Sequence, residues 1–338
     1  MSKPQPEEVR IALVMNGGVS LAVWMGGVTT EIFRIVTQTH PVYREILKLT
    51  NSVAKVDVIS GTSAGGVNGA ALAIALLYGG KFESLREVWM ETGALESLLS
   101  SPVGPSCGAL LRGEEFFFPH IVEAFNSLAC EDAPLDTAYK DAIDLQLTTT
   151  SLTGRRVETV DSLGTKVEDV DYRGHFRFRR DDCVNDFKEM GKDKVLAALS
   201  RAARSTASFP FAFEPSPIDA GEDARLFDAL DNPLVEQRHV IDGGILNNKP
   251  IRGALKAIFN VLRERGVRRV LAYINPDPGD GRQPASMSEA PSLYDGFCRS
   301  KARWPSKNDC YVLLMKRESR TGWRQKAAFC LRTSSALS

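Results

Sequence analysis

Short apolar runs alternate with longer segments of helical periodicity along most of this chain. Residues 11–15 (IALVM) form the first run; it stops at the glycine-containing turn 16–18, and apolar positions then recur at helical spacing over 19–37. Residues 56–60 (VDVIS) form a second run, which precedes an apolar helical segment over 64–78. A strand, a glycine turn and a helix in repeated order indicate an α/β protein.

The same alternation continues to about residue 275. Further helices are predicted over 82–99, 194–204 and 251–265, and further strands over 143–150, 175–180, 240–242 and 267–275. A glycine-containing turn around 152–156 separates the first two of these strands. We therefore expect a three-layer α/β/α fold with a central, mostly parallel sheet.

After about residue 278 the character of the chain changes. Residues 276–292 are rich in Pro, Gly, Ser and Asp, which is typical of a loop or linker, and beyond them only 311–315 resembles a strand. Residues 299–338 hold ten Lys/Arg against two Asp/Glu. We expect one domain over 1–280 and a basic, cysteine-containing tail over 281–338, which is either an interaction arm or a piece foreign to the domain.

Composition narrows the classes of function. The chain of 338 residues contains 42 Lys plus Arg and 42 Asp plus Glu, and this balance gives no argument for nucleic-acid binding. The N-terminus lacks the pattern of a secretory signal, and the six cysteines show no metal-type spacing. We therefore expect a cytoplasmic protein, peripheral at membranes at most, with reduced thiols and neither metal nor cofactor.

One uncharged stretch is long enough to cross a bilayer. Residues 58–80 contain six glycines and several polar side chains, and Asp57 directly precedes them. This stretch is predicted to form two buried elements joined by a tight turn, and we expect no transmembrane helix.

The turn inside that stretch matches G-x-S-x-G. The segment Gly61-Thr62-Ser63-Ala64-Gly65 lies between an apolar run and an apolar helix, as the nucleophile elbow of a serine hydrolase does. In such an elbow the flanking glycines let the backbone turn sharply, Ser63 is strained and exposed, and the Ala64 amide donates to an oxyanion. Taken alone, the pentapeptide is equally compatible with a glycine-rich turn that tucks a helix under a sheet.

Two further glycine turns follow predicted strands. Gly17 and Gly18 open a helix, where consecutive amides can face an anion. Asp242 is followed by Gly243 and Gly244, and by itself is typical of a turn former or helix cap. Neither a Walker-type lysine nor G-x-G-x-x-G spacing is present, so phosphate-loop and dinucleotide binding are unsupported.

A catalytic serine also needs a base. His120, His175 and His239 lie in no distinctive motif, and no histidine follows Asp242, so a Ser-acid-His order with Asp242 as the acid fails. A dyad of Ser63 and Asp242 remains, in which the carboxylate takes the serine proton directly. Because a carboxylate of ordinary pKa, about 3.9, is a weak base, this dyad requires partial burial of Asp242 and a strong oxyanion hole.

Five segments in chain order resemble the patatin-like phospholipases. The three most specific are Asn16-Gly17-Gly18, Gly61–Gly65 and Asp242-Gly243-Gly244 with Asn247-Asn248-Lys249-Pro250, and the two weaker ones are 144–154 and 203–210. Together they cover roughly residues 9–278. The stretch 17–27 is most similar to the longer bacterial patatin-related proteins, which continue well beyond the length of this chain, so we expect a truncated or altered member.

This resemblance implies a role for each residue of the site. It implies that Ser63 is the nucleophile, that Asp242 is its base, and that the amides of Gly17, Gly18 and Ala64 form the oxyanion hole. It further implies hydrolysis of a carboxylic ester of a lipid or phospholipid through an acyl-serine intermediate, without metal or cofactor and with transient contact to a membrane surface.

The first motif departs from the family pattern at two positions. Val19 and Leu21 replace a glycine and a basic residue, which leaves the backbone donors but removes a positive charge. Three alternatives stay open: a patatin-fold binding or regulatory protein with little or no catalysis, a Ser-His-Asp esterase or peptidase, and an acyltransferase. The sequence does not specify the acyl chain, the head group or the oligomeric state.

Overall fold

The structure is a computed structural model that describes residues 5–18, 22–80, 82, 98–100, 109–129, 141–160, 162–219, 226–227, 238–260, 267–275, 309–319 and 322–332, the last two ranges as backbone. Its strands are β1 (Glu7–Met15), β2 (Ser52–Gly61), β3 (Ile143–Val160), β4 (Lys166–Arg180), β5 (Ser216–Ile218), β6 (Arg238–Asp242), β7 (Arg268–Ile274), β8 (Asp309–Ser319) and β9 (Gly322–Arg332). Its helices are α1 (Ala22–Thr37), α2 (Pro41–Leu49), α3 (Ala64–Tyr78), the π-helix η3 (Gly113–Phe117), α6 (Phe118–Leu128), α7 (Asp186–Glu189), α8 (Lys192–Thr206), the 3-10 helix η4 (Gly243–Ile245) and α10 (Ile251–Asn260).

The described strands form a single sheet with a parallel centre. Their order is β5-β6-β3-β2-β1-β7-β8-β9, with β4 paired to β3. The four central strands β3, β2, β1 and β7 run parallel, and the outer strands are added antiparallel. The central strands are connected through helices, as parallel neighbours require. The predicted α/β fold with a parallel centre is confirmed.

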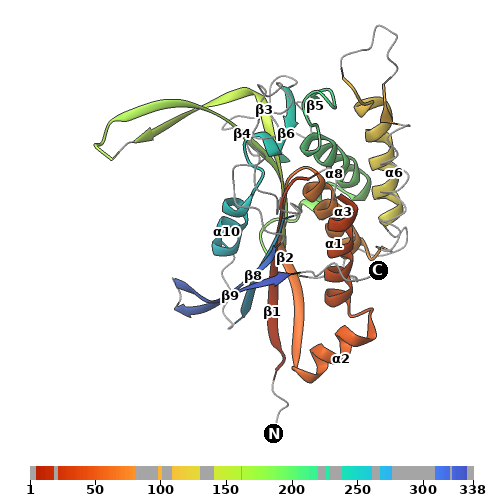
Figure 1. Cartoon of the computed structure of the whole chain (residues 1–338), viewed down its shortest axis with the longest axis vertical. Coiled ribbons are helices and arrows are strands. Elements are labelled where there is room, and N and C mark those ends of the chain that lie inside the picture. The colour runs from red at the N-terminus through yellow and green to blue at the C-terminus, as the bar shows by residue number, and fades with distance from the viewer. Residues whose placement is uncertain are drawn as a thin grey trace, which may run out of the picture.

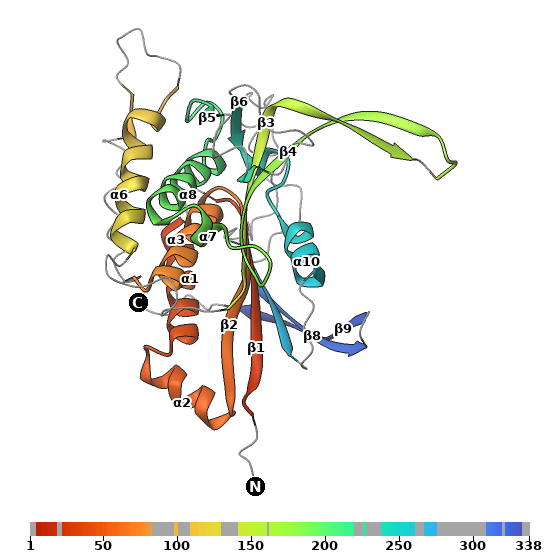
Figure 2. The same ribbon diagram turned by 180° about the vertical axis from the view of Figure 1, so that it is seen from behind.

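Alternate residues of the central strands point to different helical layers. Ile11, Leu13 and Met15 of β1 belong to a large apolar core together with residues of α1, α3, α6 and α8. Ala12 and Val14 point the other way, into a smaller core that they share with α10. Figures 1 and 2 show these two layers on opposite faces of the sheet, so both faces of the central strands are buried.

The suspected bilayer-length stretch folds as two elements. Residues 58–80 form the end of β2, a turn and α3, and every residue of α3 is buried, as predicted. Within the part of the chain that is described, no helix is long and apolar enough to cross a membrane.

The hairpin of β3 and β4 differs from the prediction. A turn was expected around 152–156, yet β3 continues to Val160, and the register instead shifts between Thr150 and Arg155. Gly154 lies in this irregular segment, where a Cβ atom would come within 2.2 Å of Val170 Cγ1. This glycine therefore allows a cross-strand neighbour to approach closely and does not end the strand. The resulting long hairpin projects from the body (Figure 1).

Several other boundaries were missed or lie outside the description. Helix α2 was not predicted; none of its residues is buried. The tail contributes two strands, β8 and β9, where only 311–315 was expected, and β8 pairs with β7. The predicted helix over 82–99 lies almost entirely outside the described residues, as do 261–265 and the linker 276–292. The proposed boundary at residue 280 stays a prediction.

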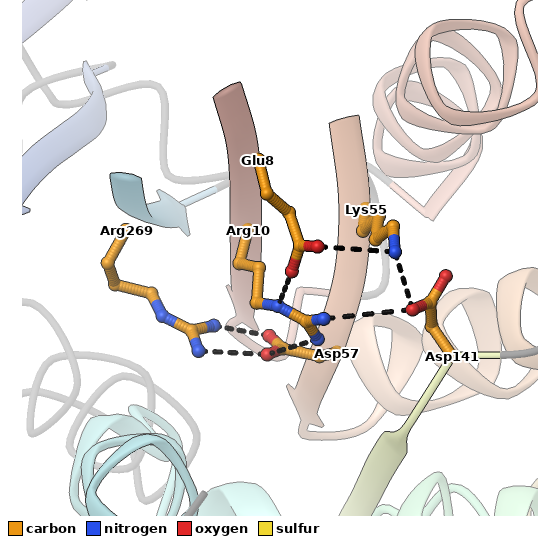
Figure 3. A network of polar contacts seen from close by, with 6 residues as sticks. All are labelled: Glu8, Arg10, Lys55, Asp57, Asp141 and Arg269. Atoms are coloured by element: carbon orange, nitrogen blue, oxygen red, sulfur yellow. Dashed lines mark hydrogen bonds and ion pairs between the residues drawn. The ribbon is translucent and has the colours of Figure 1, made fainter. Parts of the chain in front are cut away.

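A buried ionic cluster joins β1, β2 and β7 near the start of β1 (Figure 3). Arg10 and Arg269 are opposite each other in the β1–β7 ladder, and both guanidinium groups contact the carboxylate of Asp57. Arg10 is 2% exposed, and Asp57 and Arg269 are each 1% exposed. Asp57 is the extra residue of a β-bulge, since Ile11 pairs with Val56 and Ala12 with Val58. The bulge thus places one carboxylate between two buried cations.

Three further residues complete the cluster at its more accessible edge. Glu8 contacts Arg10, Lys55 Nζ lies 3.3 Å from Glu8 Oε2, and Lys55 Nζ lies 2.6 Å from Asp141 Oδ1. Burial by itself raises the pKa of Glu8, but the neighbouring Arg10 and Lys55 outweigh it, so the pKa of this carboxyl is lower than normal. The six residues carry three positive and three negative charges.

Candidate active site

Ser63 lies on a strained turn between β2 and α3. Its backbone angles are φ 54° and ψ −127°, in the left-handed half of the map that a residue with a Cβ seldom occupies. Strain of this kind is the property of a nucleophile elbow, and the sequence predicted it. The sequence also predicted that Ser63 is exposed, but in the structure this residue is only 5% exposed.

The two glycines of the elbow are needed because backbone packs directly against them. A Cβ atom on Gly61 would lie 2.6 Å from the carbonyl oxygen of Gly65, and one on Gly65 would lie 2.5 Å from the carbonyl oxygen of Asn16. Neither glycine has a positive φ angle, which in this turn is confined to Ser63. The glycines thus allow the end of β1, the turn and the start of α3 to pack closely.

Hydrogen bonds to two threonines outside the elbow, Thr148 and Thr206, hold it in place. The amide of Ser63 donates to Thr206 Oγ1 at 2.9 Å, and Thr206 Oγ1 in turn donates to the carbonyl oxygen of Thr148 at 2.6 Å. The hydroxyls of Thr62 and Thr148 are 2.7 Å apart. Because Thr148 lies on β3 and Thr206 ends α8, these bonds fix the elbow to a strand and a helix far away in the sequence.

The sheet register brings Asp242 to the same end of the sheet as Ser63. Gly61, at the end of β2, pairs with Leu147 of β3, and two residues farther along β3 Thr149 pairs with Asp242. Strand β6 is antiparallel to β3, so it approaches from beyond the end of β2 and stops at Asp242. Asp242 is 2% exposed, and its amide donates to the carbonyl oxygen of Ser208 at 2.9 Å. The predicted partial burial of this carboxyl is therefore found.

The turn after Asp242 is closed by hydrogen bonds. Asp242 Oδ1 accepts the amide of Gly244 at 2.6 Å, and the carbonyl oxygen of Asn247 accepts the hydroxyl of Thr62 at 2.9 Å. Gly243 packs against Thr148, since a Cβ atom there would lie 2.4 Å from the Thr148 carbonyl oxygen. The aspartate turn and the serine elbow therefore share Thr62 and Thr148 as supports.

The loop of Gly17 and Gly18 lies beside the serine. A Cβ atom on Gly17 would be 3.0 Å from Ser63 Cβ and 2.5 Å from Asn248 Oδ1. The amide of Gly17 donates to Asn248 Oδ1 at 3.0 Å, which differs from the oxyanion-hole role expected for it. Gly18 is half-buried in the same loop, and the Ala64 amide is the first of α3, where it has no acceptor within the helix.

The loop is anchored at both ends. Asn16 Nδ2 donates to Tyr273 Oη at 2.8 Å and to Asn275 Oδ1 at 3.0 Å, next to the end of β7. On the other side, Asn68 Nδ2 of α3 donates to the carbonyl oxygen of Ala22 at 3.1 Å, at the start of α1. These bonds fix the positions between which Gly17 and Gly18 run.

The candidate histidines are spread over three elements. His120 Nδ1 lies 2.7 Å from the carbonyl oxygen of Phe116, in its own helical turn, and the ring packs on Phe116. His239 is exposed on β6. His175 lies opposite Thr148 in the β3–β4 ladder, so it is the one of these three histidines that pairs with a residue supporting the elbow. It is therefore the informative histidine to substitute.

Sequence reasoning missed most of the supporting side chains. Thr148 and Thr206 fall inside the two weaker segments of the family resemblance, and Asn248 falls inside the third motif, but nothing in their spacing indicated contacts with Ser63 or Gly17. These contacts span from 58 to 231 positions along the chain, so only the folded topology brings the partners together.

Two comparisons with known proteins bear on the chain as a whole. A relative in Mycobacterium tuberculosis, "Uncharacterized membrane protein Rv3479", is 36% identical over an alignment 345 positions long, which covers 89% of this chain and 31% of that protein. The chain therefore spans about a third of the length of this relative. The family model of the patatin-like phospholipases matches residues 13–255, from β1 to α10 and thus across all three turns of the site. The chain belongs to the patatin-like phospholipase family.

Proposed function

We propose that this chain is a serine acyl hydrolase that cleaves carboxylic esters of lipids through a dyad of Ser63 and Asp242. The observation that carries the proposal is the strained backbone of Ser63 at the start of α3, with the buried Asp242 turn beside it. Backbone strain of this kind lowers the stability of the fold by about 1–3 kcal/mol, and it is found mainly at functional sites. The family match independently supports a lipid ester as the substrate class.

The reaction proceeds in two balanced halves. Asp242 accepts the proton of Ser63 Oγ while this oxygen attacks the ester carbonyl carbon, which gives a tetrahedral oxyanion. As the oxyanion collapses, the bond to the alcohol oxygen breaks, and the alcohol leaves with the proton from Asp242. Water then attacks the acyl-serine carbonyl carbon and gives a proton to Asp242. As this second oxyanion collapses, the bond to Ser63 Oγ breaks, Ser63 Oγ takes the proton back from Asp242, and the fatty acid leaves. An acyltransferase would differ only in using an alcohol in place of water.

The geometry favours the amides of Gly18 and Ala64 as donors to the oxyanion. The Ala64 amide lies at the positive end of α3, and Gly18 lies in the loop that packs on Ser63. Because the Gly17 amide is bound to Asn248, we assign it to holding the loop and not to the oxyanion. Backbone donors of this kind are worth about 10²–10³-fold in rate each.

Hydrolysis assays on two substrates test the proposal. Wild type should hydrolyse a monomeric ester, p-nitrophenyl butyrate, and release fatty acid from phosphatidylcholine vesicles. Ser63→Ala should lose at least ~10³-fold of both activities. No activity on either substrate from a protein with a cooperative unfolding transition would instead support a binding or regulatory protein.

His175→Gln separates the dyad from a histidine-based triad. The dyad predicts a loss of less than about threefold, because no histidine takes the serine proton. A loss of ~10²-fold or more, the usual worth of a general base, would overturn the dyad in favour of a Ser-His mechanism. His120→Gln, on α6, is the matched control.

A further inference from the structure

One side chain lies where the three turns of the site meet. The Oδ1 atom of Asn248 accepts the amide of Gly17 at 3.0 Å and lies 3.1 Å from the point where a Cβ atom on Gly244 would stand. Asp242 Oδ1 lies 2.9 Å from that same point, so the two oxygens are at most 6.0 Å apart and lie on the same glycine. On its other side, Gly17 packs on Ser63.

We infer that Asn248 is a positioning residue, which holds the Gly17–Gly18 loop against Ser63 and couples the place of this loop to the Asp242 turn. The inference rests on the proposed function and extends it to a residue outside the dyad and the oxyanion hole. The carboxamide acts through its hydrogen bond to the Gly17 amide, so that the Gly18 amide stays aimed at the developing oxyanion.

The identity of the side chain follows from its neighbours. A neutral amide oxygen accepts the Gly17 amide without placing a charge beside Asp242 or the oxyanion. A carboxylate at this position would accept the same hydrogen bond, but it would repel both the ionised Asp242 and the oxyanion. A shorter side chain would leave the Gly17 amide without its acceptor.

The first test removes the acceptor. In Asn248→Ala, labelling of Ser63 by a fluorophosphonate probe should slow by about 10–100-fold, since the donors lose their alignment. The KM for p-nitrophenyl butyrate should change less than about threefold, because the bond acts on the transition state. Asn126→Ala, an exposed asparagine on α6, is the matched control. A labelling rate equal to wild type would overturn the inference.

The second test keeps the shape and adds a charge. In Asn248→Asp, the new carboxylate should raise the pKa of Asp242, so the midpoint of the pH–rate profile for labelling should move up by about one pH unit. An unchanged midpoint would show that the side chain at position 248 does not lie beside Asp242, and it would overturn the coupling of the loop to the Asp242 turn. If Asn248→Ala fails to fold, this isosteric variant still carries the test.

Amide exchange separates this inference from the proposed function. Hydrogen–deuterium exchange of the peptide containing Gly17 should be faster in Asn248→Ala than in wild type, and close to wild type in Asn248→Asp. This result does not depend on catalysis. Faster exchange in a protein whose wild type shows no labelling would sink the proposed function alone, whereas unchanged exchange would sink the positioning role alone.

Discussion

Two regions of strands β1 and β2 are stabilised by opposite kinds of polar contact. In the first half of β1 and the middle of β2, Arg10 and Asp57 form part of a cluster of buried ion pairs with Arg269 of β7 (Figure 3). At their carboxyl ends, the turns are held by hydroxyl, amide and carbonyl groups, among them those of Thr62 and Asn248. The same sheet thus contains one region held by buried ion pairs and another region whose turns are held by neutral groups.

The proposed function gives a reason for this difference. An ion-pair cluster tolerates no unpaired member, because a buried charge without its partner is costly. An ester hydrolase, however, must generate a negative charge at the serine and stabilise it with oriented dipoles. In the proposed mechanism, neutral supports leave Asp242 as the charge that controls the reaction, whereas fixed carboxylates in their place would oppose it. The predictions below test whether the two regions are as separate as this comparison requires.

The largest expected effect is on catalysis, in Asp242→Asn. We expect labelling of Ser63 by a fluorophosphonate to slow by ~10³-fold, since the amide cannot accept the serine proton. The unfolding temperature should stay close to wild type, because an asparagine retains the oxygen that accepts the Gly244 amide. Wild-type labelling in this variant would remove Asp242 from the mechanism.

The next effect is on stability, in Asp57→Asn. Arg10 and Arg269 would then face each other without the carboxylate between them, and the free energy of unfolding should fall by about 3–5 kcal/mol. Chemical denaturation measures this loss. The labelling rate per folded molecule should equal that of wild type; a slower rate would show that the ion-pair cluster and the active site are coupled.

A smaller loss is expected in Thr206→Val. The Ser63 amide would lose its acceptor and the Thr148 carbonyl its donor, so labelling should slow by about tenfold through a looser elbow. Thr206→Ser keeps the hydroxyl and should retain most of the rate. Equal rates in both variants would contradict a role for this hydroxyl.

The smallest effect concerns acid stability, in Glu8→Gln. Because the pKa of Glu8 is lower in the folded protein than its ordinary value of 4.5, its ionisation stabilises the fold above that value. This contribution is lost as the pH falls through the lower, folded-state pKa. In Glu8→Gln the unfolding temperature should therefore drop less between pH 6 and pH 3 than in wild type. An identical drop would show that Glu8 contributes nothing.

Patterns within short stretches of the sequence predicted the elements whose residues are close together in the chain. Strand β1, the elbow and α3 were predicted from an apolar run, a glycine turn and a helical period, all within a few residues of one another. The position of Asp242 beside the elbow was implied by the family resemblance alone. Its physical basis, an antiparallel strand that stops two residues beyond the end of β2, is a property of the sheet register.

Long-range contacts could not be predicted from the pattern. Arg10 and Asp57 appear in the sequence as polar interruptions of apolar strands, and only the bulge and the neighbour strand β7 make them partners. Gly154 looked like a turn because glycine is permitted in both turns and strands, and the packing of Val170 decides between them. The Asn248 contact with Gly17 likewise needs the assembled sheet, since the two residues are 231 positions apart in the sequence.

The most direct test of the central claim is intact-mass measurement after reaction with a fluorophosphonate. This probe reacts with a serine that is activated beside an oxyanion hole. The account predicts one adduct per molecule of wild type, which peptide mapping after digestion assigns to the segment that contains Ser63, and none on Ser63→Ala. The absence of an adduct on folded wild type, or an adduct that persists in Ser63→Ala, would contradict it.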